Sequence, residues 1–230
     1  MKALVGYTGF VGSNLAAAGN FDGLYNSKNV KEAYGTNRLW LENRVKEICP
    51  DCHIVRLPGL YGKNIKKNFI YDFINYIPAL LNEKKMAELS AKEPALKDFY
   101  SLREDGFWAV KADADRPQLK EMFKKLGFSA LNFTDSRGVF QYYNLKYLYN
   151  DIQKVIDNDI RLMNIATQPI EIGTLHLKLT GEAFDNKVAA KPPYYDFKTK
   201  HAAVFGGENG YIQTASFVYD DIKEFVSEMI

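Results

Sequence analysis

The sequence predicts an α/β protein built on a parallel sheet. Short apolar runs that favour strands alternate with segments of helical periodicity, which is typical of strand–helix–strand units. A glycine-rich turn also follows the first apolar run directly. We expect an incomplete parallel-sheet portion over residues 1–62, a mostly helical insert over 63–129 and a smaller C-terminal α/β lobe over 130–230.

Composition excludes several classes of protein. The chain has 230 residues, of which 47% are hydrophobic and 25% charged, so it can bury a sizeable core. Its formal net charge is only +2 and its basic residues are scattered, which argues against a nucleic-acid partner. No apolar run approaches the roughly 20 residues that a membrane helix needs. The N-terminus shows no signal-peptide pattern, so we expect a cytoplasmic protein with no membrane partner and with reduced cysteines.

The first third of the chain contains three predicted strands and two predicted helices. Residues 3–5 and 22–25 are short apolar strands, and a helix is expected between them from Phe10 to Ala18. Apolar spacing from Val30 to Ile48 favours a second helix, although Gly35 interrupts the pattern. The last elements of this portion are a β-branched strand from His53 to Leu57 and a loop at Pro58–Gly62.

The remaining elements follow from periodicity and breaker residues. Residues 66–128 are expected to be largely helical, and Lys191–Pro193 has the composition of a linker. The other predictions are strands at Ala130–Phe133 and Arg161–Ala166, and helices at Tyr142–Ile156, at Ile172–Leu179 ending at Gly181, and at Phe217–Met229.

The glycine turn carries the strongest chemical signal. Gly6, Gly9 and Gly12 lie between the first strand and the first helix. Glycines in this place permit a tight turn, a close approach of backbone to a pyrophosphate, and close helix–strand packing. The pattern therefore predicts a Rossmann-like dinucleotide site, with an ordinary glycine turn as the alternative. The candidate cofactor-binding residues here are Gly6, Thr8, Gly9, Phe10, Val11 and Gly12.

Residues 6–15, Gly-Tyr-Thr-Gly-Phe-Val-Gly-Ser-Asn-Leu, resemble the turn of the extended short-chain dehydrogenase/reductases, the family of sugar-nucleotide epimerases and dehydratases. The resemblance covers residues 1–62 and about 130–230. It rests further on residues 53–62, on Asn132–Asp135 with Arg161–Ala166, and on Asp196–Gly206. It implies a small-molecule substrate with a hydroxyl or carbonyl group, such as a nucleotide sugar.

Cofactor preference is indicated by the end of the second strand. An acid there usually accepts the ribose hydroxyls of NAD, but this chain has Asn26, Ser27 and Lys28. A 2′-phosphate would be tolerated beside Lys28, so NADP is slightly preferred to NAD; the alternative is that Lys28 is a solvated loop residue. The resemblance also implies that Pro58 and Leu60 lie beside the nicotinamide and the substrate.

Tyr34 and Arg38 resemble the family's tyrosine–lysine pair, four residues apart. The resemblance implies that Tyr34 acts as general acid/base and that Arg38 lowers its pKa, although arginine departs from the family's lysine. The i,i+4 spacing places both groups on one helix face. Tyr34 could equally be an ordinary residue near a deletion junction. Tyr142 and Lys146 share the spacing, and we interpret them as a packed helix face.

A central segment of the family's architecture is missing from this chain. Only residues 27–33 separate the second strand from Tyr34, whereas intact members have three more strands there and each strand–helix–strand unit takes about 30 residues. Two readings compete with an active enzyme: a non-catalytic remnant with weak nucleotide binding or an interaction role, and an internal deletion of a longer enzyme. Relatives often pair through helices of the nucleotide domain, so a homodimer is one expectation that the missing segment puts in question.

Cys49-Pro50-Asp51-Cys52-His53 matches a haem-attachment spacing. The pair follows the C-terminus of a predicted helix, and only His53, His176 and His201 could add imidazole ligands. We therefore interpret the segment as turn and strand packing, with no metal site.

Overall fold

The computed structural model describes residues 3–5, 23–25 and 34–230. These residues form a mixed α/β protein with small sheets and two compact units. The first unit contains residues 1–65, 139–171 and 193–225, and the second contains 66–138, 172–192 and 226–230. The chain passes repeatedly between the units, so each is assembled from segments that are distant in sequence.

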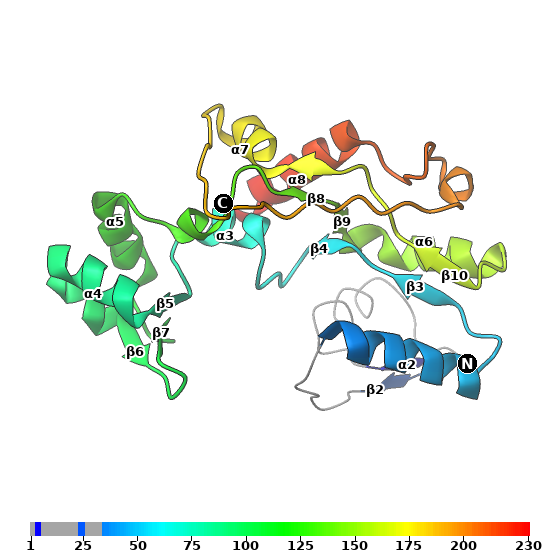
Figure 1. The fold of residues 1–230 in the computed structure, drawn as a ribbon, viewed down its shortest axis with the longest axis horizontal. Helices are drawn as coiled ribbons and strands as arrows, with labels where there is room; N and C mark the ends of the chain where they lie inside the picture. Colours follow the sequence, from blue (N-terminus) through cyan, green and yellow to red (C-terminus); the bar gives the residue numbers. More distant parts are fainter. Residues whose placement is uncertain (1–2, 6–22, 26–33) are drawn as a thin grey trace. The chain divides into compact units, whose positions relative to one another are not determined.

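Parallel strand pairs characterise the first unit. β1 (Ala3–Val5) pairs with β2 (Gly23–Tyr25), and β3 (Ile54–Arg56) pairs with β10 (Leu162–Asn164). These strands lie within the predicted ones. The described part of the following helix, α2, runs from Tyr34 to Ile48. Figure 1 shows the chain passing from α2 into β3 and then β4.

The predicted loop at Pro58–Gly62 is wrong, because β4 (Gly59–Tyr61) pairs in parallel with β9 (Tyr142–Asn144). Gly59 is required for close strand approach rather than for a turn: a Cβ added there would lie 2.8 Å from the carbonyl oxygen of Gln141. Its presence beside Pro58 gave the segment the composition of a loop, although the segment forms a sheet.

The predicted helix at Tyr142–Ile156 is also partly wrong. β9 occupies its first three residues, and the short 3₁₀ helix η3 (Leu145–Tyr147) leads into α6 (Leu148–Asp157). The helical spacing is genuine from residue 145 onward, where Leu145, Leu148 and Val155 are buried. The core around them contains Tyr143, Leu145, Leu148, Val155, Ile160, Met163, Ile165 and Ile212.

The rest of the first unit is formed by short elements and a long terminal helix. β8 (Val139–Phe140) pairs antiparallel with β11 (Ile170–Glu171). The 3₁₀ helix η4 (Ala202–Phe205) precedes the terminal helix α8 (Ala215–Met229). α8 confirms the helix predicted at Phe217–Met229.

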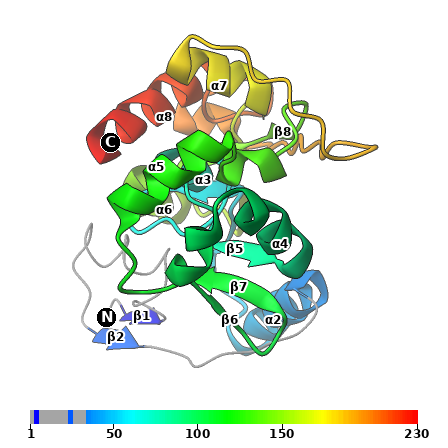
Figure 2. The same ribbon diagram turned by 90° about the vertical axis from the view of Figure 1, so that its left-hand side faces the viewer.

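The second unit corrects the prediction that residues 66–128 are largely helical. Three short antiparallel strands form a sheet in the order β5-β7-β6, with β5 at Leu80–Asn82, β6 at Tyr100–Leu102 and β7 at Phe107–Val110 (Figure 2). Each strand has three or four residues, too few to show a period-2 pattern. The helical elements of this region are α3 (Phe69–Asn75), α4 (Glu83–Lys92), η1 (Pro94–Phe99) and α5 (Arg116–Leu126).

Ala130–Phe133 is the 3₁₀ helix η2 and not the predicted strand. Ser129 begins it with a capping box, in which its hydroxyl accepts from the Leu131 amide while the Asn132 side chain accepts from the Ser129 amide. These local hydrogen bonds override the apolar pattern. α7 (Ile172–Thr180), by contrast, forms where predicted and ends at Gly181, whose φ is 79°.

Lys191–Pro193, the predicted linker, contains neither helix nor strand. No helix in the described part of the chain is long and apolar enough to cross a membrane.

Candidate functional site

The predicted cofactor residues of the N-terminal segment lie outside the described residues; they are Gly6, Thr8, Gly9, Phe10, Val11, Gly12, Asn26, Ser27 and Lys28. The strands before and after the glycine turn are described. β1 ends at Val5, immediately before Gly6, and runs parallel to β2 with Val5 opposite Tyr25. In the sequence, Gly6 therefore comes directly after the carboxyl end of a parallel strand.

Tyr34 and Arg38 both lie on α2, one turn apart, and their side chains are outside the described part of the chain. Two turns beyond Tyr34, Glu42 joins this helix to β3. Arg56 donates to its carboxylate from Nε at 2.9 Å and from Nη2 at 2.8 Å, and Lys46 Nζ donates at 2.7 Å. Hydrogen bonds from Arg56 and then Lys46 lower the pKa of Glu42 to about 2. The ion pair thus attaches the tyrosine helix to the strand that leads to Pro58.

Pro58 lies two residues beyond the carboxyl end of β3, and Leu60 lies in β4. Both are half-buried. Leu60 belongs to β4, opposite Tyr143 in register, and it packs against the first unit's core. β3 and β10 run in parallel, so Pro58 lies at the edge of the sheet where ligands bind in open α/β folds.

A buried carboxylate that the sequence did not indicate lies beside Tyr61, the last residue of β4. Asp221 of α8 is 5% exposed and accepts hydrogen bonds from the Tyr61 hydroxyl, from Asn144 Nδ2 at 2.8 Å and from the Tyr147 hydroxyl at 2.5 Å. Lys146 Nζ forms an ion pair with it at 2.6 Å. Burial alone would raise the pKa of Asp221, but hydrogen bonds from Lys146, Tyr147 and Tyr61 outweigh burial and hold this pKa below its usual value.

With four partners, Asp221 anchors α8 to β4 and β9 rather than exchanging a proton. The cluster also corrects the interpretation of Tyr142 and Lys146 as a packed helix face. Tyr142 lies in β9 and Lys146 in η3, so the two are not one turn apart on a helix. Tyr61 and Asp221 are 160 residues apart, and no local pattern links them.

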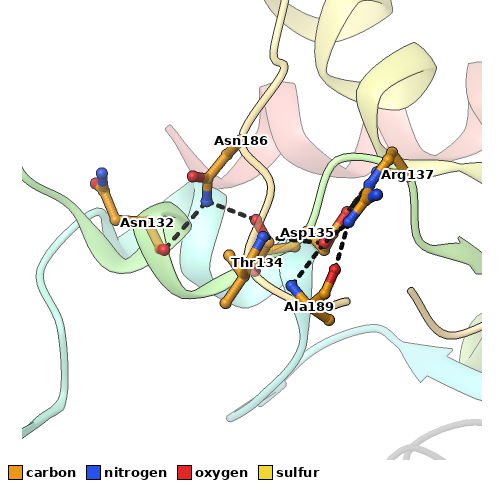
Figure 3. A network of polar contacts seen from close by, with 7 residues as sticks. Asn132, Thr134, Asp135, Arg137, Asn186 and Ala189 are labelled. Carbon is orange, nitrogen blue, oxygen red and sulfur yellow. Dashed lines mark hydrogen bonds and ion pairs between the residues drawn. The ribbon is translucent and has the colours of Figure 1, made fainter. Parts of the chain in front are cut away.

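A second carboxylate network lies within the second unit (Figure 3). Arg137 donates to Asp135 from Nε at 2.9 Å and from Nη2 at 2.7 Å, and the amides of Val188 and Ala189 both donate at 2.9 Å. Asn186 Nδ2 donates to the carbonyl oxygens of Thr134 at 2.7 Å and Asn132 at 3.1 Å. Arg137 and the backbone amides lower the pKa of Asp135. The network fastens residues 186–189 to the 132–137 segment, which is a structural role.

Cys49 and Cys52 are free thiols, Cys49 exposed and Cys52 half-buried. The Cys52 amide donates to the Cys49 carbonyl oxygen at 3.0 Å, forming a turn, and His53 Nδ1 lies 2.9 Å from the Ile160 carbonyl oxygen. Among the described residues, no three His, Cys, Asp or Glu side chains are grouped so that they could hold a metal ion.

No protein-family model and no curated protein matches the sequence. The solved structures that match this chain include the following two. dTDP-glucose 4,6-dehydratase from Bacillus anthracis str. Ames, in complex with NAD, has a TM-score of 0.37 and 14% identity, over 98% of this chain and 94% of that chain. A hypothetical dTDP-4-dehydrorhamnose reductase from Sulfolobus tokodaii has a TM-score of 0.33 and 12% identity, over 96% and 94%. Scores of this size are too low to assign a function.

Proposed function

We propose that this protein binds a nicotinamide dinucleotide through its glycine turn and acts as an oxidoreductase of the epimerase/dehydratase type. Its substrate would be a nucleotide sugar or a similar hydroxyl or carbonyl compound. One observation carries the proposal: β1 and β2 are parallel neighbours, and the glycine turn follows β1 directly.

Parallel pairing matters because two parallel strands require a crossover connection, whereas two antiparallel strands can be joined by a hairpin. Glycines in a hairpin would serve the turn alone. Glycines at the start of a crossover lie at the carboxyl edge of the sheet, where backbone amides and a helix N-terminus can bind a pyrophosphate. The β1–β2 register therefore favours a phosphate-binding role for Gly6, Gly9 and Gly12.

The proposed chemistry assigns one role to each predicted residue. When bound, the dinucleotide supplies a hydride acceptor and donor. Tyr34 would act as a phenolate, stabilised by Arg38 one turn along α2. It would take the proton of the substrate hydroxyl and become the neutral phenol, while the hydride passes to the dinucleotide. Pro58 and Leu60 would border the substrate, and the Glu42–Arg56 ion pair would hold α2 against β3.

Cofactor titration tests the binding step. NADPH and NADH are added separately while protein fluorescence is followed, using the wild type, Gly9→Val and Gly106→Asn. Gly106 is the matched control because it has φ 80°, which asparagine tolerates, and an added Cβ would meet nothing within 4 Å. We expect micromolar binding that Gly9→Val weakens at least tenfold and Gly106→Asn leaves unchanged. Absence of saturable binding to the wild type would contradict the proposal.

Cofactor choice and turnover need two further variants. Lys28→Ala should weaken NADPH binding more than NADH binding, since only NADPH carries the 2′-phosphate. In a preparation that turns over nucleoside-diphosphate sugars, Tyr34→Phe should keep cofactor affinity and lower kcat by about a hundredfold. Unchanged turnover would remove Tyr34 from the mechanism. Cofactor binding with no turnover of any substrate would favour the non-catalytic remnant.

A further inference from the structure

A row of positive charge runs along α5. Arg116, Lys120 and Lys124 are spaced four residues apart, so they lie on one face at intervals of about 6 Å. Arg116 and Lys124 are exposed and Lys120 is half-buried. Within the described part of the chain, Arg116 and Lys120 form no ion pair or side-chain hydrogen bond. Lys124 binds Glu121 at 2.7 Å, and its ammonium has three donors, which leaves capacity for another carboxylate.

This row borders an open groove of about 740 Å³ within the second unit. Its lining includes the apolar side chains of Ile74, Ile77, Pro117 and Met229. Met229 is 48% exposed, so the groove presents apolar surface beside the cations. A surface that combines these two features suits an amphipathic, acidic partner rather than a small polar anion.

The same chain carries a complementary row on α8. Asp220, Glu224 and Glu228 have the same four-residue spacing and all three are exposed. Glu224 also pairs with Lys146 Nζ of the same chain at 3.1 Å. Phe217 precedes them on the same face and is 43% exposed. The opposite face of α8 is buried through Val218, Ile222, Phe225 and Val226. The acidic row therefore points outward from a helix that is held by its other face.

We propose that the protein self-associates, with the acidic row of α8 in one copy docked along the α5 groove of a second copy. Because both rows follow the rise of an α-helix, the carboxylates of one copy can meet the cations of the other in one register. Phe217 supplies an apolar side chain for the apolar lining of the groove. Nucleic acid fits less well, because no residue that lines the groove is aromatic and could stack on a base.

Exposed ion pairs are individually weak and are screened by salt, so the association should be salt-sensitive. Sedimentation velocity on the full chain, at tens of micromolar protein and at about 50 mM and 500 mM salt, measures it. We expect a dimer at low salt whose Kd rises roughly tenfold or more at high salt. A wild type that stays monomeric at low salt would overturn the proposal.

Charge reversal identifies the surfaces. Lys120→Glu with Lys124→Glu forms one variant, and Asp220→Lys with Glu228→Lys forms the other; each alone should be monomeric. An equimolar mixture should associate again, because the unchanged acidic row on α8 of the first variant can still dock along the unchanged basic row on α5 of the second. Lys84→Glu with Lys92→Glu is the control, since it makes the same charge change on α4 and should leave the dimer intact.

Circular dichroism checks that both α5 and α8 variants are folded. If the α5 variant dimerises like the wild type, the groove is not the interface. If the mixture stays monomeric although both variants are folded, α8 is not the occupant, and the proposal is wrong.

Discussion

Arg56 binds the carboxylate of Glu42 with two parallel hydrogen bonds, from Nε at 2.9 Å and from Nη2 at 2.8 Å. The two residues are 14 positions apart and belong to different elements, β3 and α2. A bidentate arginine–carboxylate pair restricts orientation as well as distance. It therefore holds the helix that carries Tyr34 and Arg38 in a defined relation to the strand that leads to Pro58 and Leu60.

Replacing Glu42 with glutamine should lower the free energy of unfolding by about 1 kcal/mol at pH 7. The folded-state pKa is about 2, against an ordinary value of 4.5. The carboxylate therefore stabilises the fold fully above pH 4.5, and this contribution is lost as the pH falls toward 2. Urea unfolding across this range measures it, with Glu47→Gln as the exposed control. An equal difference at pH 7 and near pH 2 would contradict the assignment.

Asp72 should behave in the opposite way. Burial raises the pKa of its carboxyl from 3.8 to about 6, so the charged form is disfavoured in the folded protein. The resulting penalty is absent below pH 3.8, develops between pH 3.8 and 6, and is complete above pH 6. Asp72→Asn should therefore stabilise the protein by about 1–2 kcal/mol at pH 7.5.

The difference between Asp72→Asn and the wild type should disappear near pH 3.5, where both side chains are neutral. Denaturant unfolding at both pH values measures this, with the exposed Asp113→Asn as a control. A variant that is less stable than the wild type at pH 7.5 would show that the Asp72 charge is needed.

Removing the carboxylate of Asp221 should be strongly destabilising. Asp221→Ala leaves the Tyr61 hydroxyl and the Asn144 amide buried without their acceptor, and it leaves Lys146 without this counter-charge. We expect a loss of about 3 kcal/mol in the free energy of unfolding. Asp157→Ala, at an exposed position near the end of α6, should change it by less than about 0.5 kcal/mol. Similar losses for the two variants would rule out an anchoring role for Asp221.

Gly127 ends α5 in the left-handed conformation, with φ 60°. Its amide donates to the Lys124 carbonyl oxygen, and the Phe128 amide donates to that of Phe123, which closes the last turn. Gly127→Ala should cost about 1 kcal/mol through backbone strain, because an added Cβ meets open space. Thermal unfolding measures this. Gly127→Asn should cost less, since asparagine tolerates positive φ, and equal costs for the two variants would argue against strain as the cause.

Elements whose signals are local could be predicted from the sequence. The helix at Ile172–Thr180 combines apolar spacing with a terminal glycine, and the strand at Ile54–Arg56 is β-branched. The spacing of Tyr34 and Arg38 on one helix likewise follows from α-helical geometry. These features depend on neighbours within a few residues.

Elements that require a distant partner could not be predicted. β4 has the composition of a loop and becomes a strand because β9, about 80 residues later, supplies its hydrogen bonds. The β5-β7-β6 sheet arises in the same way within a segment that has helical periodicity. The Asp221 cluster joins three segments that share no pattern in sequence.

The sequence by itself determined the short strands at residues 3–5 and 23–25, the helices at Ile172–Thr180 and Ala215–Met229, and the four-residue spacing of Tyr34 and Arg38 on α2. Tertiary structure alone decided which strands pair, which carboxylates are buried with partners, and which helix faces remain exposed. The physical reason is range: turn and helix preferences arise within one or two turns of backbone, whereas strand pairing and the burial of charge depend on segments that only the folded chain brings together.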